Sequence, residues 1–187
     1  MATFDKAELR RRIRAAYPGV AQRNAESEAL CRHVLAWQEY RQAVVVGAYV
    51  PMKREADVTP ILRDALMTGK TLLLPRVESE GRMTFRRVRD LTSLVVGAYG
   101  LLEPGEREEV ADPVSLDVLI VPIEGIDRHG LRLGKGGGYY DRMLGATHCR
   151  TIGAVMSWQW VSSVPRESWD QALEMAVDCE GIHCFAE

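Results

Sequence analysis

The chain has 187 residues, of which 47% are hydrophobic and 27% charged, and its formal net charge is −2. This composition is typical of a single compact domain spanning residues 1–187 with a sizeable core. It argues against a general nucleic-acid or membrane-surface binder, and no apolar run approaches the ~18 residues of a membrane span. The N-terminal segment is amphipathic without an apolar signal core, so we expect a cytoplasmic protein with reduced cysteines.

Helical and strand-like patterns alternate along the chain. In chain order they predict helices at residues 5–16, 21–39, 59–69 and 139–144, and strands at residues 43–50, 71–75, 83–88, 116–122, 151–156 and 175–178. Asp5 followed by Glu8 predicts a capping box for the first helix. Thr59 and Pro60 predict the N-cap and first position of the third. Residues 97–113 are rich in Gly, Pro and Glu and are expected to form a long loop.

Strands that alternate with helices predict an α/β fold with a largely parallel sheet. In such sheets ligands bind at the carboxyl ends of strands. Residues 49–55 follow the strand expected at 43–50, and a glycine-rich loop follows the strand expected at 116–122. We therefore expect both segments to face one cleft.

The glycine-rich loop has five glycines among the nine residues 130–138 and leads into the helix expected at 139–144. Glycine lets a backbone approach an anion and turn its N–H groups inward, and a helix start adds further donors. The loop matches neither a Walker A motif nor a dinucleotide fingerprint. The residues by themselves therefore leave two interpretations open, an anion site or a tight connection.

Several charged and aromatic residues near this loop also allow two interpretations. Tyr139 and Tyr140 can stack on a flat ring or pack as ordinary helix residues. Asp141 can hold Mg²⁺ beside phosphates or pair with an arginine. Lys6 and Arg10 lie one helical turn apart and can reach phosphates if their helix docks near the cleft, or they can form a solvated basic face.

Carboxylates elsewhere are also candidates. Glu55 and Asp57 follow a strand and precede a helix, so they can accept hydrogen bonds from a ligand or cap the helix. Asp170 is a further carboxylate in an expected loop. Trp158 and Trp160 can form a cleft wall or part of the core.

Residues 127–142, DRHGLRLGKGGGYYDR, resemble the signature of the 5-formyltetrahydrofolate cyclo-ligase family. Shorter similarities follow the family's order over nearly the whole chain, at residues 6–10, 49–55, 74–76, 100–104 and 152–170. The resemblance implies a single-domain, three-layer α/β/α fold of the kind that sugar-phosphate isomerases and CoA transferases share.

The resemblance also implies an activity. It is the ATP- and Mg²⁺-dependent conversion of 5-formyltetrahydrofolate to 5,10-methenyltetrahydrofolate, with release of ADP and phosphate, through a phosphorylated formyl group. ATP and Mg²⁺ are the implied cofactors. The implied partner is a small folate, with or without a polyglutamate tail, and we expect a monomer that binds neither nucleic acid nor a membrane.

Roles for individual residues follow from the same resemblance. The implied catalytic residues are Lys135, Arg132 and Tyr140. The implied ATP-binding residues are Lys6, Arg10, Arg132, Gly134, Lys135, Gly136, Gly137, Gly138, Tyr139 and Tyr140. The implied substrate-binding residues are Arg10, Val50, Met52, Glu55, Tyr99 and Tyr140. The implied metal ligands are Asp141 and Asp170.

Two other classes of function are kept as alternatives. One is a sugar-phosphate isomerase-like enzyme on the same fold, which needs a base such as Asp127 or His129 near a sugar carbon. The other is a nucleotide- or RNA-binding module that uses the basic first helix and shows steeply salt-dependent binding.

Overall fold

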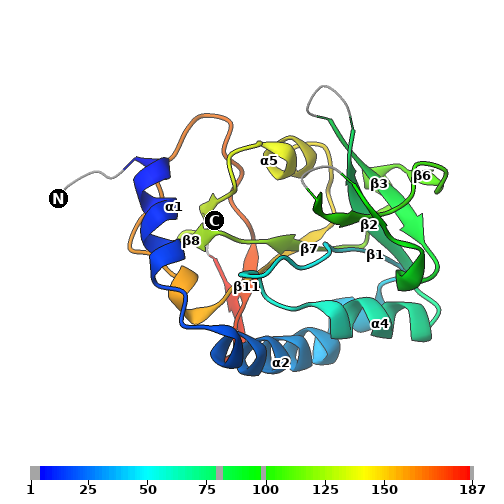
Figure 1. Cartoon of the computed structure of the whole chain (residues 1–187), viewed down its shortest axis with the longest axis horizontal. Helices are drawn as coiled ribbons and strands as arrows, with labels where there is room; N and C mark the ends of the chain where they lie inside the picture. The colour runs from blue at the N-terminus through cyan, green and yellow to red at the C-terminus, as the bar shows by residue number, and fades with distance from the viewer. Residues whose placement is uncertain (1–4, 79–81, 98–99, 186–187) are drawn as a thin grey trace.

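The computed structural model describes residues 5–78, 82–97 and 100–185 (Figure 1). The helices are α1 (Lys6–Ala15), α2 (Val20–Ala36), α3 (Gln38–Gln42), α4 (Thr59–Met67) and α5 (Tyr139–Leu144). The strands are β1 (Val45–Gly47), β2 (Thr71–Val77), β3 (Met83–Val88), β4 (Val95–Val96), β5 (Leu102–Glu103), β6 (Val110–Ala111), β7 (Val118–Pro122), β8 (Gly125–Ile126), β9 (Arg132–Leu133), β10 (Arg150–Ala154), β11 (Met175–Val177) and β12 (Ile182–Cys184). No helix in the described ranges is both long and apolar enough to cross a membrane.

Within the described residues, eight strands form one mixed sheet in the order β12-β11-β10-β7-β1-β2-β3-β6. The central strands β11, β10, β7, β1 and β2 pair in parallel. The edge strands β12 and β6, and β3 beside β6, join antiparallel. The hairpins β4–β5 and β8–β9 lie outside this sheet. The predicted largely parallel α/β sheet is confirmed.

The sheet lies between two layers of unequal thickness. Helices α2 and α4 pack on one face, and α5 lies over the other (Figure 1). The two faces share β7, where Ile120 packs toward α2 and α4 while Leu119 and Val121 pack toward α5. A strand buried on both faces is apolar at every position, which explains the unbroken hydrophobic run that predicted it.

Long-range contacts changed several predicted boundaries. The strand predicted at 43–50 pairs only over Val45–Gly47, because the chain then leaves the sheet. The helix predicted at 21–39 is broken at Trp37, which has extended backbone, and α3 follows. The loop predicted at 97–113 contains β5 and β6.

The helix caps also differ from their predictions. Asp5 accepts a hydrogen bond from the Glu8 amide at 2.7 Å, but the Glu8 carboxylate pairs with Arg11 and Arg12, so only half of the capping box forms. Thr59 is the first residue of α4 rather than its N-cap, and its amide donates to Asp57 at 3.1 Å. Asp57 therefore caps the N-terminal end of α4, which is one of the two roles predicted for it.

Candidate active site

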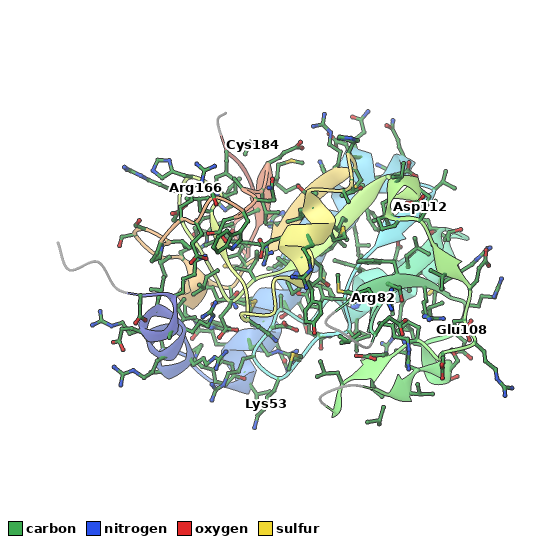
Figure 2. The ribbon with its side chains drawn as sticks, turned by 90° about the horizontal axis from the view of Figure 1, so that it is seen from above. Lys53, Arg82, Glu108, Asp112, Arg166 and Cys184 are labelled. Carbon is green, nitrogen blue, oxygen red and sulfur yellow. The ribbon has the colours of Figure 1, made fainter. Side chains whose placement is uncertain are left out.

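A cavity of about 550 Å³ lies at the carboxyl ends of the central strands. Its walls come from the ends of β2 and β7, the segment after β1, the glycine-rich loop, and α1 and α5. Seen from above in Figure 2, α5 lies on the near side of the sheet, and Lys53 in the segment after β1 points outward from the molecule. The prediction that the glycine loop and residues 49–55 face one cleft is confirmed.

The cavity brings together nearly all the residues that the sequence singled out. Those that line it are Lys6, Arg10, Val50, Met52, Glu55, Arg132, Gly134, Lys135, Gly136, Gly137, Gly138, Tyr139, Tyr140, Asp141 and Asp170. Tyr99 lies outside the described residues. The first helix therefore docks at the cleft, and its Lys6 and Arg10 are not a solvated basic face.

The glycine loop leaves its amide groups available to a ligand. Gly136 and Gly138 have φ values of +107° and +65°, which side-chain-bearing residues rarely adopt. None of the N–H groups of residues 134–138 donates a hydrogen bond to another described residue. The Gly134 carbonyl, by contrast, accepts from Arg10 Nε at 2.8 Å. Backbone amides that have no protein acceptor are suited to an anion.

Arg132 and Asp141 form the most deeply buried ion pair of the cavity. Arg132 Nη2 donates to Asp141 Oδ1 at 2.7 Å, and the two side chains are 3% and 18% exposed. Burial lowers the pKa of Arg132, and the charge of Asp141 partly offsets that effect. Asp141 thus makes the arginine pair that was one of its two interpretations.

Lys6 is held by two carboxylates from a loop that is distant in sequence. Its Nζ lies 2.7 Å from Glu167 Oε2 and 2.7 Å from Asp170 Oδ2. Burial disfavours the ammonium, but hydrogen bonds to Asp170 and Glu167 outweigh it and raise the pKa of Lys6. Asp170 also accepts from the Glu167 amide at 2.7 Å, which fixes the orientation of its carboxylate.

Glu55 is engaged on both carboxylate oxygens. Oε1 lies 2.6 Å from Lys135 Nζ, and Oε2 accepts from the Met52 amide at 2.8 Å. The second contact stabilises the turn after β1, so Glu55 closes its own loop as well as facing the cavity. Three predicted cations, Lys6, Arg132 and Lys135, are therefore each paired with a predicted carboxylate.

Three buried polar atoms of cavity-lining side chains lack a hydrogen-bond partner among the described residues. They are Arg132 Nε, the Tyr140 hydroxyl and Glu103 Oε2. Burial raises the pKa of Tyr140 well above its usual range, so the hydroxyl keeps its proton. The Arg132 guanidinium also lies 5.7 Å from the centre of the Tyr140 ring. Unpaired buried donors are uncommon in folded proteins, and a bound ligand is one reason for them.

The two candidate bases for an isomerase, Asp127 and His129, do not line the cavity. Asp127 is 1% exposed and accepts hydrogen bonds from the amides of His129, Leu131 and Val164, so it shapes the turn between β8 and β9. His129 is exposed on that turn. Neither side chain is placed to act on a ligand in the cavity.

Three arginines of the basic first helix form ion pairs with neighbouring carboxylates. Arg11 and Arg12 pair with Glu8, and Arg14 pairs with Glu124 at 2.5 Å. Nucleic-acid binding depends on cations that can neutralise phosphates. These ion pairs therefore disfavour an RNA-binding role for α1.

Comparison with known proteins agrees with this geometry. Residues 2–178 match the model of the 5-formyltetrahydrofolate cyclo-ligase family. The chain belongs to that family of enzymes. It is 32% identical over 177 residues to the 5-formyltetrahydrofolate cyclo-ligase of Escherichia coli K12, covering 90% of this chain and 95% of that relative. The Haemophilus influenzae 5-formyltetrahydrofolate cyclo-ligase is 30% identical over 169 residues, covering 87% of this chain and 90% of that protein.

Solved structures give the same result. The structure of Aquifex aeolicus 5,10-methenyltetrahydrofolate synthetase superposes with a TM-score of 0.85 and 31% identity, covering 97% of this chain and 93% of that one. A synthetase from Mycoplasma pneumoniae superposes at 0.77 over 94% of this chain and 99% of that one, and at 20% identity it supports the fold alone.

Cyclo-ligase motifs did not reveal the whole cavity wall. Neither Glu167, which pairs with Lys6, nor Glu103, which is buried in the wall beside β2, is among the predicted site residues. For Glu103 the available signal was its place in residues 100–104, one of the segments that resemble the family. For Glu167 no local signal existed, because its partner is 161 residues away.

Proposed function

We propose that this chain catalyses the ATP- and Mg²⁺-dependent cyclisation of 5-formyltetrahydrofolate to 5,10-methenyltetrahydrofolate, releasing ADP and phosphate. The observation that carries the proposal is a single cavity lined both by an amide-rich glycine loop with cations and by an apolar, carboxylate-bearing pocket. The glycine loop with its cations suits a triphosphate, and the apolar pocket suits a flat reduced heterocycle. Family membership supports the same pairing of ligands.

The triphosphate would lie against residues 134–140. The loop amides would cradle its phosphates, and Lys6, Arg10, Arg132 and Lys135 would neutralise their charge. Because three of these cations are paired with carboxylates in the structure, nucleotide binding would exchange one partner for another. The cations would pair with phosphate oxygens, and the carboxylates that they now contact would become available to other ligands.

Asp141 and Asp170 would then hold Mg²⁺. Their carboxylates are hard oxygen donors, and both line the cavity. No group of three or more metal-binding side chains occurs among the described residues. That donor set still fits Mg²⁺, which is commonly bound by one or two carboxylates together with substrate phosphates and water. When bound, the ion would supply positive charge beside the transferred phosphoryl group.

The folate would occupy the pocket beside Val50, Met52 and Glu55, with its formyl oxygen toward the terminal phosphate. A formamide oxygen is a poor leaving group, so transfer of the γ-phosphoryl group to that oxygen activates the carbon. N10 then attacks the carbon and loses its proton, and phosphate departs with the former formyl oxygen. Lys135 and Arg132 would align and neutralise the phosphoryl group, and Tyr140 would donate a hydrogen bond.

An absorbance assay tests the proposal. The protein is mixed with 5-formyltetrahydrofolate, ATP and Mg²⁺, and the methenyl chromophore is followed with time. We expect its formation to require all three components and to match the release of ADP. A folded protein that forms no chromophore would refute the proposal.

A further inference from the structure

One ion pair joins the two halves of the cavity. Lys135, on the glycine loop, places its Nζ 2.6 Å from Oε1 of Glu55, on the segment after β1. The Lys135 ammonium also contacts the sulfur of Met52 in the same segment. The loop is the part proposed to hold the triphosphate, and the segment after β1 is the part proposed to hold the folate. Each ligand would therefore bind at one end of the same ion pair.

The Glu55 end of the pair is fixed in place. Its Oε2 accepts from the Met52 amide at 2.8 Å, its own amide donates to the Met52 carbonyl at 3.0 Å, and its carbonyl accepts from Arg23 Nε at 2.8 Å. The Glu55 side chain is only 7% exposed. This carboxylate cannot follow a departing cation, and a buried charge that loses its partner is costly.

The Lys135 end of the pair can move at little cost. Its side chain is 39% exposed, and Glu55 is the only carboxylate that pairs with it among the described residues. Gly134 and Gly136 flank it in the chain, and Gly136 has a φ of +107°. A flexible side chain between two glycines can turn toward a phosphate that lies over the loop amides.

Breaking this pair makes the two ligands interdependent. A triphosphate that binds alone attracts Lys135 and leaves the buried charge of Glu55 without its cation. A folate that binds alone has to displace Lys135 before it can donate to Glu55 Oε1. When both ligands bind, the ammonium pairs with the phosphates and the carboxylate accepts from the folate, so neither penalty remains.

We propose that the Lys135–Glu55 ion pair couples nucleotide binding to folate binding, so that each ligand raises the affinity for the other; this rests on the proposed function. Such coupling is reciprocal by thermodynamic necessity and typically amounts to about 5–150-fold. Lys135 acts in it as a positioning residue, since it neutralises Glu55 until a phosphate is present. The pair favours the ternary complex and disfavours a nucleotide bound without its acceptor.

Titration calorimetry measures this coupling without turnover. The protein is titrated with 5-formyltetrahydrofolate in the presence and absence of saturating Mg²⁺ and a non-hydrolysable ATP analogue. For the wild type we expect the analogue to tighten folate binding about tenfold or more. For Lys135→Met we expect folate to bind several-fold more tightly than to the wild type when the analogue is absent, because no cation has to be displaced. The analogue should then change that affinity little.

The matched control is Lys6→Met. Lys6 is also a cavity cation held by carboxylates, but its partners are Glu167 and Asp170 rather than Glu55. This variant should weaken binding of the analogue, yet at saturating analogue it should keep the wild-type tightening of folate. Lys135→Arg retains the cation and should retain the coupling.

Glu55→Gln tests the other end of the pair and covers the case in which Lys135→Met does not fold. A neutral amide holds the Lys135 ammonium less strongly than a carboxylate does. We therefore expect the analogue alone to bind several-fold more tightly to Glu55→Gln than to the wild type. General damage to the structure would weaken nucleotide binding instead.

The coupling and the proposed function fail in different ways. A wild-type protein that converts 5-formyltetrahydrofolate, but binds it equally well with and without the analogue, overturns the coupling alone. Coupling that persists in Lys135→Met, coupling that is lost equally in Lys6→Met, or unchanged or weaker analogue binding in Glu55→Gln overturns the role of this ion pair. A wild-type protein that neither binds nor converts the folate overturns both proposals.

Discussion

Replacing Asp141 with asparagine separates its structural role from its catalytic one. Asp141 is the partner of Arg132, whose side chain is 3% exposed and bonded at 2.7 Å. Removing one partner of a buried pair costs about 3–5 kcal/mol. Asparagine keeps an acceptor oxygen but not the charge, so we expect the free energy of unfolding to fall by about 1–3 kcal/mol. For a chain of this size each kcal/mol lowers Tm by about 2–4 °C.

The same substitution removes a proposed Mg²⁺ ligand, so we expect turnover to fall at least about 100-fold at saturating ATP. The assay is chromophore formation over a range of Mg²⁺ concentrations, beside thermal unfolding followed by circular dichroism. The matched control is Glu78→Gln, because the Glu78 carboxylate accepts a hydrogen bond from the buried Arg86 at 2.7 Å and does not line the cavity. The control should lose stability but keep activity. An Asp141→Asn enzyme with wild-type turnover would refute the metal assignment, and one with unchanged Tm would refute the structural argument.

Three further changes test other parts of the structure. Arg10→Ala removes the contact with the Gly134 carbonyl and should raise KM for ATP about tenfold in steady-state assays. Unchanged KM values for both substrates would mean that Arg10 of α1 does not contribute to ligand binding. Gly138→Ala forces a side chain into φ +65° at a cost of about 1–2 kcal/mol, so Tm and kcat should both fall; wild-type values would argue against a rigid loop. Burial opposes the charge of Asp178, but His183 Nε2 at 2.9 Å and the hydrogen bonds from the Glu180 amide and the Trp160 indole outweigh it and lower the pKa of Asp178 below its usual value. Asp178 therefore stabilises the fold above about pH 3.8 and loses this effect as pH falls through its native pKa. The stability difference between wild type and Asp178→Asn, measured by urea unfolding, should shrink in that acidic range; a constant difference down to the lowest measurable pH would contradict the assignment.

Local patterns in the sequence determined the elements that depend on local interactions. Alternation at 83–88 predicted β3 with its observed ends, and the glycine-to-tyrosine boundary predicted α5 at 139–144. The same composition marked the glycine loop as either an anion site or a tight connection, because glycine's backbone freedom is a property of the residue itself. The resemblance of residues 127–142 to a known signature then indicated the family, which the comparisons confirmed.

Only the tertiary structure decided how the charged groups of the site are paired. Lys6 meets Asp170 across 164 residues, and Lys135 meets Glu55 across the cavity, so no local periodicity could match them. The wall that contains Glu103 likewise exists only because β2, β3 and β5 bring distant segments together. Periodicity reports which face of an element is buried, whereas the sheet order determines which buried faces and strand ends meet.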